Sequence, residues 1–250
     1  APGGAPLRIG IARDRAFGFY YADDLDALRA LGAELVAIDT LRDATLPELD
    51  GLVIGGGFPE TCMRELEANA ALRAVLRAAI EAGLPTYAEC GGLMYLSRSL
   101  AWRGERAAMV GVIPGDTVMH ERPVGRGYVQ LETTDAAPWD EPGRLLSGHE
   151  FHHSSLENLE SGLGFAYRVR RGHGIDGLVD GVRMHNMLAS YAHLRGGAGA
   201  AAGGGQRERD EEGEGFAADD MPRMTVSSWR RSGVSAVRSS CTRSRPTRSM

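Results

Sequence analysis

Residues 84–96, with the sequence LPTYAECGGLMYL, most narrowly limit what this chain can fold into. Residues 84–88 predict a short buried strand, Cys90 lies at a sharp turn, and Gly91 and Gly92 begin a helix. A cysteine at a strand-to-helix turn is lifted out of the sheet, and the amide groups of the new helix favour its thiolate. The pattern therefore predicts a nucleophilic Cys90, with a buried structural cysteine as the alternative.

Strands and helices alternate along the first hundred residues. Apolar runs predict strands at residues 7–12, 34–38 and 52–54. Helical spacing predicts helices at residues 20–31 and 60–82, which alternate with these strands. This alternation predicts an α/β fold with a doubly wound, mostly parallel sheet that binds ligands at the carboxyl ends of its strands. Beyond Trp102, short apolar runs between turns predict added short antiparallel strands.

A second glycine-rich turn, Gly55 to Gly57, follows the strand at residues 52–54. Two such turns at the ends of adjacent parallel strands place backbone amides near one point. We therefore expect an oxyanion hole formed by Gly56 or Gly57 together with Gly91. Neither turn carries a Walker-A lysine or a dinucleotide fingerprint, so neither predicts a nucleotide site.

A thiolate that attacks an amide needs a proton shuttle for the leaving nitrogen, and this is usually a histidine. His193 follows small residues and Tyr191 at the end of the last patterned segment, which suits a shuttle held over a pocket. Spacing alone does not select His193 over His149 or His185.

The segment GHEFHHS, residues 148–154, raises the question of a metal site. In a strand, His149, Phe151 and His153 would share one face, whereas Glu150 and His152 would share the other. Because this alternation divides the ligands between two faces, we expect a polar or substrate-facing strand and no metal site.

Composition places the folded part between residues 7 and 195, with residues 1–6 as a linker. After Arg195 the chain becomes rich in Gly and Ala, then acidic, then rich in Arg and Ser, and this predicts a disordered tail at 196–250. The 250 residues contain no apolar run of membrane-spanning length and carry a net charge of −5, which argues against membrane and nucleic-acid partners. The three cysteines lack metal-ligand spacing and are too few for a disulfide framework, so we expect a reduced, cytoplasmic protein.

Four blocks in this order resemble the glutaminase domain of cobyrinic acid a,c-diamide synthases: GGGFPE at 55–60, AECGGLMYL at 88–96, HEFHHS at 149–154 and ASYAHL at 189–194. That domain is a class I glutamine amidotransferase with a flavodoxin-like fold. The resemblance implies that Cys90 forms a glutamyl thioester, that His193 is the base, and that the GGGFPE block supplies the oxyanion hole.

The same resemblance points to further site residues. Many class I relatives carry a glutamate two residues after the histidine, whereas this chain has Arg195. A Cys–His dyad without that acid is therefore implied. Glu89, His149 and His152 belong to the matching blocks, and Gly127-Tyr128 resembles a further family signature. We take Glu89, His149, His152 and Tyr128 as candidates for substrate-facing positions.

Members of this family also carry an upstream ATP-dependent ligase domain, which is absent from this chain. The resemblance therefore implies glutamine as substrate and no cofactor in this domain. ATP and Mg²⁺ are expected in a ligase domain on a longer chain or a separate subunit, where ammonia amidates the a and c carboxylates of cobyrinic acid. Siroheme-type or nickel-sirohydrochlorin substrates, another thiol hydrolase and a non-catalytic interaction module are the alternatives.

Overall fold

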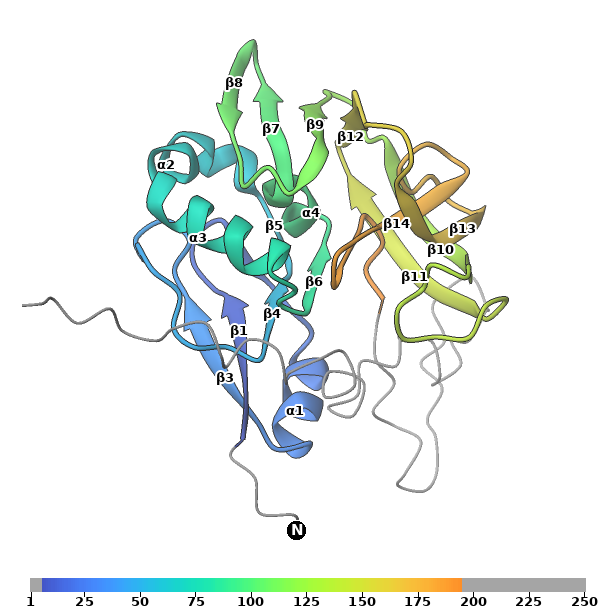
Figure 1. The fold of residues 1–250 in the computed structure, drawn as a ribbon. Coiled ribbons are helices and arrows are strands. Elements are labelled where there is room, and N and C mark those ends of the chain that lie inside the picture. The colour runs from blue at the N-terminus through green and yellow to red at the C-terminus, as the bar shows by residue number, and fades with distance from the viewer. Residues whose placement is uncertain (1–5, 195–250) are drawn as a thin grey trace, which may run out of the picture.

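The computed structural model describes residues 6–194 of the chain (Figure 1). Residues 1–5 and 195–250 lie outside the described residues, and with them lie most of the expected linker and the whole expected disordered tail. Within the described part, no helix is long and apolar enough to cross a membrane.

A nine-stranded sheet in the order β11-β10-β13-β14-β15-β6-β4-β1-β3 forms the centre of the molecule. Neighbours from β3 to β15 pair in parallel, whereas β15, β14, β13, β10 and β11 pair antiparallel. Figure 1 shows β1, β3 and β4 in its left half, β6 near the middle, and β10, β11, β13 and β14 in its right half. The strands are β1 Leu7–Ala12, β3 Ala33–Ile38, β4 Gly51–Ile54, β6 Thr86–Glu89, β10 Gly125–Thr133, β11 Leu145–His152, β13 Gly164–Arg171, β14 Val179–Met184 and β15 Met187–Ser190.

Two smaller sheets and a few helices complete the described part. One sheet has the order β12-β9-β7-β8, and β2 pairs with β5. Their strands are β2 Phe17–Phe19, β5 Gly56–Gly57, β7 Ser97–Trp102, β8 Glu105–Ala108, β9 Ile113–Met119 and β12 Ser154–Glu157. The helices are α1 Ala22–Ala30, the 3-10 turn η1 Pro59–Cys62, α2 Met63–Ala68, α3 Ala70–Glu81 and α4 Gly91–Leu96.

Helices cover both faces of the parallel strands, because successive side chains of β4 point alternately into two different apolar cores. Leu52 and Ile54 belong to a core that includes the apolar face of α3. Val53, which points the other way, belongs to a second core against which Leu25 and Leu28 of α1 pack. The predicted α/β class with a doubly wound parallel half is confirmed. The antiparallel strands of the second half are also present, and β10 is nine residues long, longer than expected.

The single helix predicted over residues 60–82 is wrong, because the chain breaks at Asn69. The Asn69 side chain accepts a hydrogen bond from Leu72 N at 3.3 Å and so caps α3. Its amide nitrogen donates to the carbonyls of Thr40 and Asp43, each at 2.9 Å. An asparagine favours this capping role over a helix interior, and here it also ties the helix start to the loop after β3.

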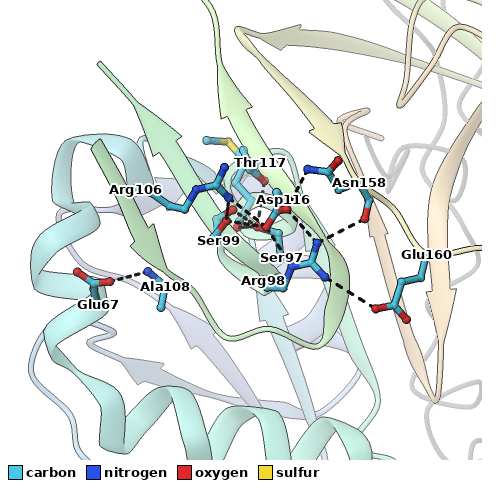
Figure 2. A network of polar contacts seen from close by, with 11 residues as sticks. Glu67, Ser97, Arg98, Ser99, Arg106, Ala108, Asp116, Thr117, Asn158 and Glu160 are labelled. Atoms are coloured by element: carbon cyan, nitrogen blue, oxygen red, sulfur yellow. Dashed lines mark hydrogen bonds and ion pairs between the residues drawn. The ribbon is translucent and has the colours of Figure 1, made fainter. Parts of the chain in front are cut away.

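A polar network centred on Asp116 of β9 holds the small sheet together (Figure 2). Arg98 donates to both carboxylate oxygens, at 3.1 and 2.9 Å, and Ser99 and Asn158 donate at 2.7 and 3.1 Å. The guanidinium of Arg98 is the main reason that the pKa of Asp116 lies well below its usual range. Because β7 follows α4 directly, this network anchors the chain just after the turn that carries Cys90.

Candidate active site

Cys90 lies at the predicted turn between β6 and α4 in a strained backbone conformation, with φ 46° and ψ −101°. Positive φ is uncommon for a residue with a side chain and persists only where the surroundings hold it. Here Cys90 N donates to Ser190 O at 2.8 Å, and Met94 N donates to Cys90 O at 3.1 Å. The sulfur lies 3.9 Å from the carbonyl oxygen of Phe151, and the residue is 7% exposed.

The two glycine-rich turns meet beside this cysteine. Strands β4 and β6 are adjacent and parallel, so their carboxyl ends share one edge of the sheet. Gly91 packs directly on Gly57, since a Cβ built on Gly91 would lie 2.9 Å from both the nitrogen and the oxygen of Gly57. The expected neighbourhood of Gly56, Gly57 and Gly91 is therefore present.

His193 reaches the same edge because β15 runs parallel to β6. Its ring is 5% exposed and lies against Gly56, where a Cβ would come within 2.8 Å of Cε1. The ring of Phe19 stands edge-on to it, with centroids 5.2 Å apart. Nδ1 lies 3.2 Å from Oε2 of Glu89, and the ring also interacts electrostatically with Cys90.

The surroundings of His193 favour its protonated form. Burial lowers its pKa, but the interactions with Cys90 and with the Glu89 carboxylate outweigh burial and raise the pKa to about 10. A cysteine beside a protonated histidine reacts as the thiolate. The pair is thus arranged for attack by sulfur and proton donation by imidazole.

Glu89 is buried and uses both carboxylate oxygens within the protein. Oε1 accepts the Tyr87 hydroxyl at 2.7 Å and the backbone N–H of Leu194 at 3.2 Å. Oε2 contacts Nδ1 of His193. The structure therefore places this side chain behind the histidine, whereas the sequence had indicated a substrate-facing position.

His149 reaches the site because the antiparallel strands curl back toward β15. The backbones of His149 and His193 form an isolated bridge with N–H···O distances of 3.1 and 2.8 Å, although β11 and β15 are four places apart in the sheet. The two rings stack with centroids 5.0 Å apart, and His149 Nδ1 hydrogen-bonds the Tyr21 hydroxyl at 3.2 Å. Burial, followed by the charge of His193, lowers the pKa of His149.

The predicted alternation along β11 is confirmed, and it separates His152 from His149. His152 is buried beside Tyr191, with ring centroids 3.9 Å apart, and its Nε2 lies 3.6 Å from Oε2 of Glu150. Tyr128 of β10 pairs in register with His149 and is 41% exposed, so it borders the site.

His185, which spacing left open as the base, lies exposed in the turn before β15, at the opposite end of that strand from His193. Residues 6–194 contain no group of three or more His, Cys, Asp or Glu side chains that could hold a metal ion. Sequence reasoning missed the contacts of Tyr21 and Phe19 with the two histidines. Only the fold brings Phe19 of β2 and Tyr21, the residue before α1, to residues 149 and 193.

The two described cysteines provide a direct test of this environment. We expect iodoacetamide at neutral pH to alkylate Cys90 faster than Cys62, because Cys90 has a protonated histidine beside it. Cys62 is 1% exposed and belongs to the apolar core. Mass spectrometry of the folded chain after timed quenching measures both rates, and equal rates would contradict the proposed activation.

Comparisons with known proteins show the family and the fold of this chain. A family model described as the CobB/CobQ-like glutamine amidotransferase domain matches residues 8–199. The chain belongs to this family. A crystal structure of a glutamine amidotransferase has the same fold, with a TM-score of 0.54 and 21% identity over 74% of this chain and 89% of that one. The fold is that of class I glutamine amidotransferases.

Two relatives within this family are both named cobyrinate a,c-diamide synthase. The protein from Magnetococcus marinus is 48% identical over 192 residues, which are 77% of this chain and 41% of the relative. The protein from Methanosarcina barkeri is 41% identical over 208 residues, which are 78% of this chain and 42% of the relative. The chain therefore spans about two fifths of the length of these relatives.

Proposed function

We propose that this domain hydrolyses glutamine with Cys90 as nucleophile and His193 as proton shuttle, and that it supplies the ammonia to an amide-forming ligase. One observation carries the proposal: in a chain of the amidotransferase family, the His193 ring lies against Gly56 and interacts with Cys90, at the edge where two glycine-rich turns meet.

In the first half of the reaction, the sulfur of Cys90 attacks the side-chain carbonyl carbon of glutamine and forms a C–S bond. The carbonyl oxygen takes up the electron pair and becomes an oxyanion. His193, protonated at neutral pH because of its raised pKa, gives its proton to the amide nitrogen. The C–N bond then breaks, ammonia leaves, and a glutamyl thioester remains on Cys90.

In the second half, the now neutral His193 removes a proton from water as the water oxygen attacks the thioester carbon. The C–S bond breaks and glutamate leaves, which restores the Cys90 thiolate and the protonated His193. The same imidazole acts as acid and then as base, so it must stay within reach of both the sulfur and the substrate nitrogen.

The oxyanion of both steps needs N–H donors held in place before the reaction. We assign this role to the Gly91 amide, together with Gly56 or Gly57. The first amides of a helix have no acceptor within the helix, and Gly91 begins α4. The packing of Gly91 on Gly57 supports a contribution from both turns.

The destination of the ammonia is proposed from the relatives. Because they are named cobyrinate a,c-diamide synthase and are more than twice as long as the matched segment, we propose a ligase domain as partner and the a and c carboxylates of cobyrinic acid as acceptors. ATP and Mg²⁺ would be used there, and this domain needs no cofactor of its own. The free thiols of Cys62 and Cys90 support a reducing, cytoplasmic setting.

A reconstituted reaction tests the whole proposal. We expect the chain, mixed with the ligase portion of such a relative, ATP, Mg²⁺ and cobyrinic acid, to release glutamate from glutamine and to yield the diamide. Asparagine should replace glutamine poorly, and sirohydrochlorin or its nickel complex should replace cobyrinic acid poorly. Liquid chromatography with mass detection follows both products.

Three outcomes would overturn parts of this proposal. No glutamate with any ligase portion would indicate a non-catalytic interaction module. Hydrolysis of peptide amides as fast as glutamine would indicate another thiol hydrolase. Turnover with nickel-sirohydrochlorin or sirohydrochlorin in place of cobyrinic acid would assign the domain to the synthesis of a different tetrapyrrole.

A further inference from the structure

We propose that Glu89, the residue directly before the nucleophile, is the acid that positions His193. The proposal rests on the glutaminase function argued above. It concerns a side chain that touches neither sulfur nor substrate in that mechanism, so Glu89 is a positioning residue and acts through the imidazole.

The hydrogen bonds around Glu89 leave one oxygen for the histidine. Oε1 is occupied by the Tyr87 hydroxyl and by the N–H of Leu194. Oε2 faces Nδ1 of His193 at 3.2 Å, and both side chains are largely buried. A buried carboxylate in this position accepts the Nδ1 proton, so Nε2 becomes the ring nitrogen available to Cys90 and the substrate.

The backbone connects the acid, the nucleophile and the histidine into one unit. Glu89 ends β6, Cys90 follows it, and β15 beside them leads to His193. The bond from Leu194 N to Oε1 fixes the residue after the histidine to the same carboxylate. A shift of Glu89 would therefore move the histidine relative to the sulfur.

The other groups that face the His193 ring do not supply this charge. Cys90 lies at its reactive side, His149 of β11 stacks on one face, and Phe19 of β2 meets it edge-on. Among residues 6–194, the carboxylate that interacts with the His193 ring is that of Glu89. Two positions after the histidine, where many class I relatives carry a glutamate, the sequence has Arg195.

The test compares Glu89→Gln with Glu132→Gln in the full chain. Both substitutions remove a paired carboxylate, and Glu132 of β10 pairs with Arg168 and Arg170 away from His193. Glutamine at position 89 preserves shape but removes the charge. We expect the titration midpoint of His193, followed by NMR of the imidazole, to fall by at least one pH unit in Glu89→Gln and to stay unchanged in Glu132→Gln.

Turnover provides the second readout. We expect Glu89→Gln to lower kcat for glutamine on the order of a hundredfold, with KM changed by less than about threefold, because substrate contacts stay intact. Should Glu89→Gln fail to fold, Glu89→Asp is the second variant. It keeps the negative charge but shortens the side chain by one methylene, which moves the carboxylate oxygens away from His193. We expect that variant to fold and to lose kcat in the same way.

The outcomes separate this inference from the proposed function. An unchanged His193 midpoint, or a lowered midpoint with wild-type kcat, would overturn the positioning role of Glu89. A wild-type chain that releases no glutamate with a ligase portion would overturn the proposed function. The NMR titration would then still decide whether Glu89 holds His193.

Discussion

We expect Cys90→Ala to abolish glutamine-dependent amidation and to leave ammonia-dependent amidation by the ligase portion close to the wild-type rate. In the proposed mechanism the Cys90 sulfur contacts only the glutamyl group, so free ammonium bypasses it. Loss of the nucleophile from such a unit costs on the order of a thousandfold or more in rate. Diamide formation from cobyrinic acid, measured first with glutamine and then with ammonium, gives both rates.

The control for this experiment is Cys62→Ala, which removes the other described thiol. Cys62 lies in the apolar core beside Met63, and its sulfur contacts the Thr61 hydroxyl at 3.6 Å, so both ammonia sources should still support synthesis. Glutamine-dependent synthesis by Cys90→Ala at a rate near wild type would show that another residue is the nucleophile. Loss of the ammonium route in Cys90→Ala would show that this domain also shapes the ligase site.

Local pattern was enough to predict the elements that carry the nucleophile. Strand β1 has the bounds that its apolar run predicted, and the glycine pair after Cys90 begins α4 as expected. The two glycine-rich turns lie on adjacent parallel strands because short strand–helix units allow few other arrangements. These features depend on neighbouring residues and on the handedness of crossovers, and both can be inferred from a single sequence.

The role of Glu89 depends on distant contacts, which a local pattern does not reveal. Its partner His193 is 104 residues away, and the two meet because β15, which follows the antiparallel strands in the sequence, pairs with β6. One signal was nevertheless present. Glu89 lies one residue beyond the predicted strand at 84–88 and two residues after Tyr87. A strand extended to residue 89 would place both side chains on one face and so suggest a buried carboxylate with a hydroxyl partner.

The closing of the antiparallel strands onto the site could not be predicted either. His149 and His193 are joined by two backbone hydrogen bonds, yet nothing in either segment indicates that β11 returns to β15. The break at Asn69 is a different kind of error, since an asparagine within a helical pattern is itself a capping signal. Helical spacing on both sides of Asn69 concealed that signal.

We expect Gly92→Ala to cost both stability and turnover, because the second glycine of the turn has no room for a side chain. A Cβ at this position would lie 2.2 Å from the carbonyl oxygen of Ile54 and 3.0 Å from its carbonyl carbon. These are backbone atoms of β4, so they cannot rotate away, and α4 must move off the sheet. Overpacking typically costs about 1–3 kcal/mol of unfolding free energy, and we expect the upper end of this range because the clash is with backbone atoms.

The same displacement should separate Cys90 from His193. A misplacement of roughly 1 Å between reacting groups costs on the order of a hundredfold in rate. Denaturant unfolding and glutamine-dependent amidation measure the two losses, and Gly164→Ala in β13 is the matched control, since its Cβ would meet nothing nearer than 3.5 Å. Wild-type stability and turnover in Gly92→Ala would show that the contact between α4 and β4 does not hold the nucleophile in place.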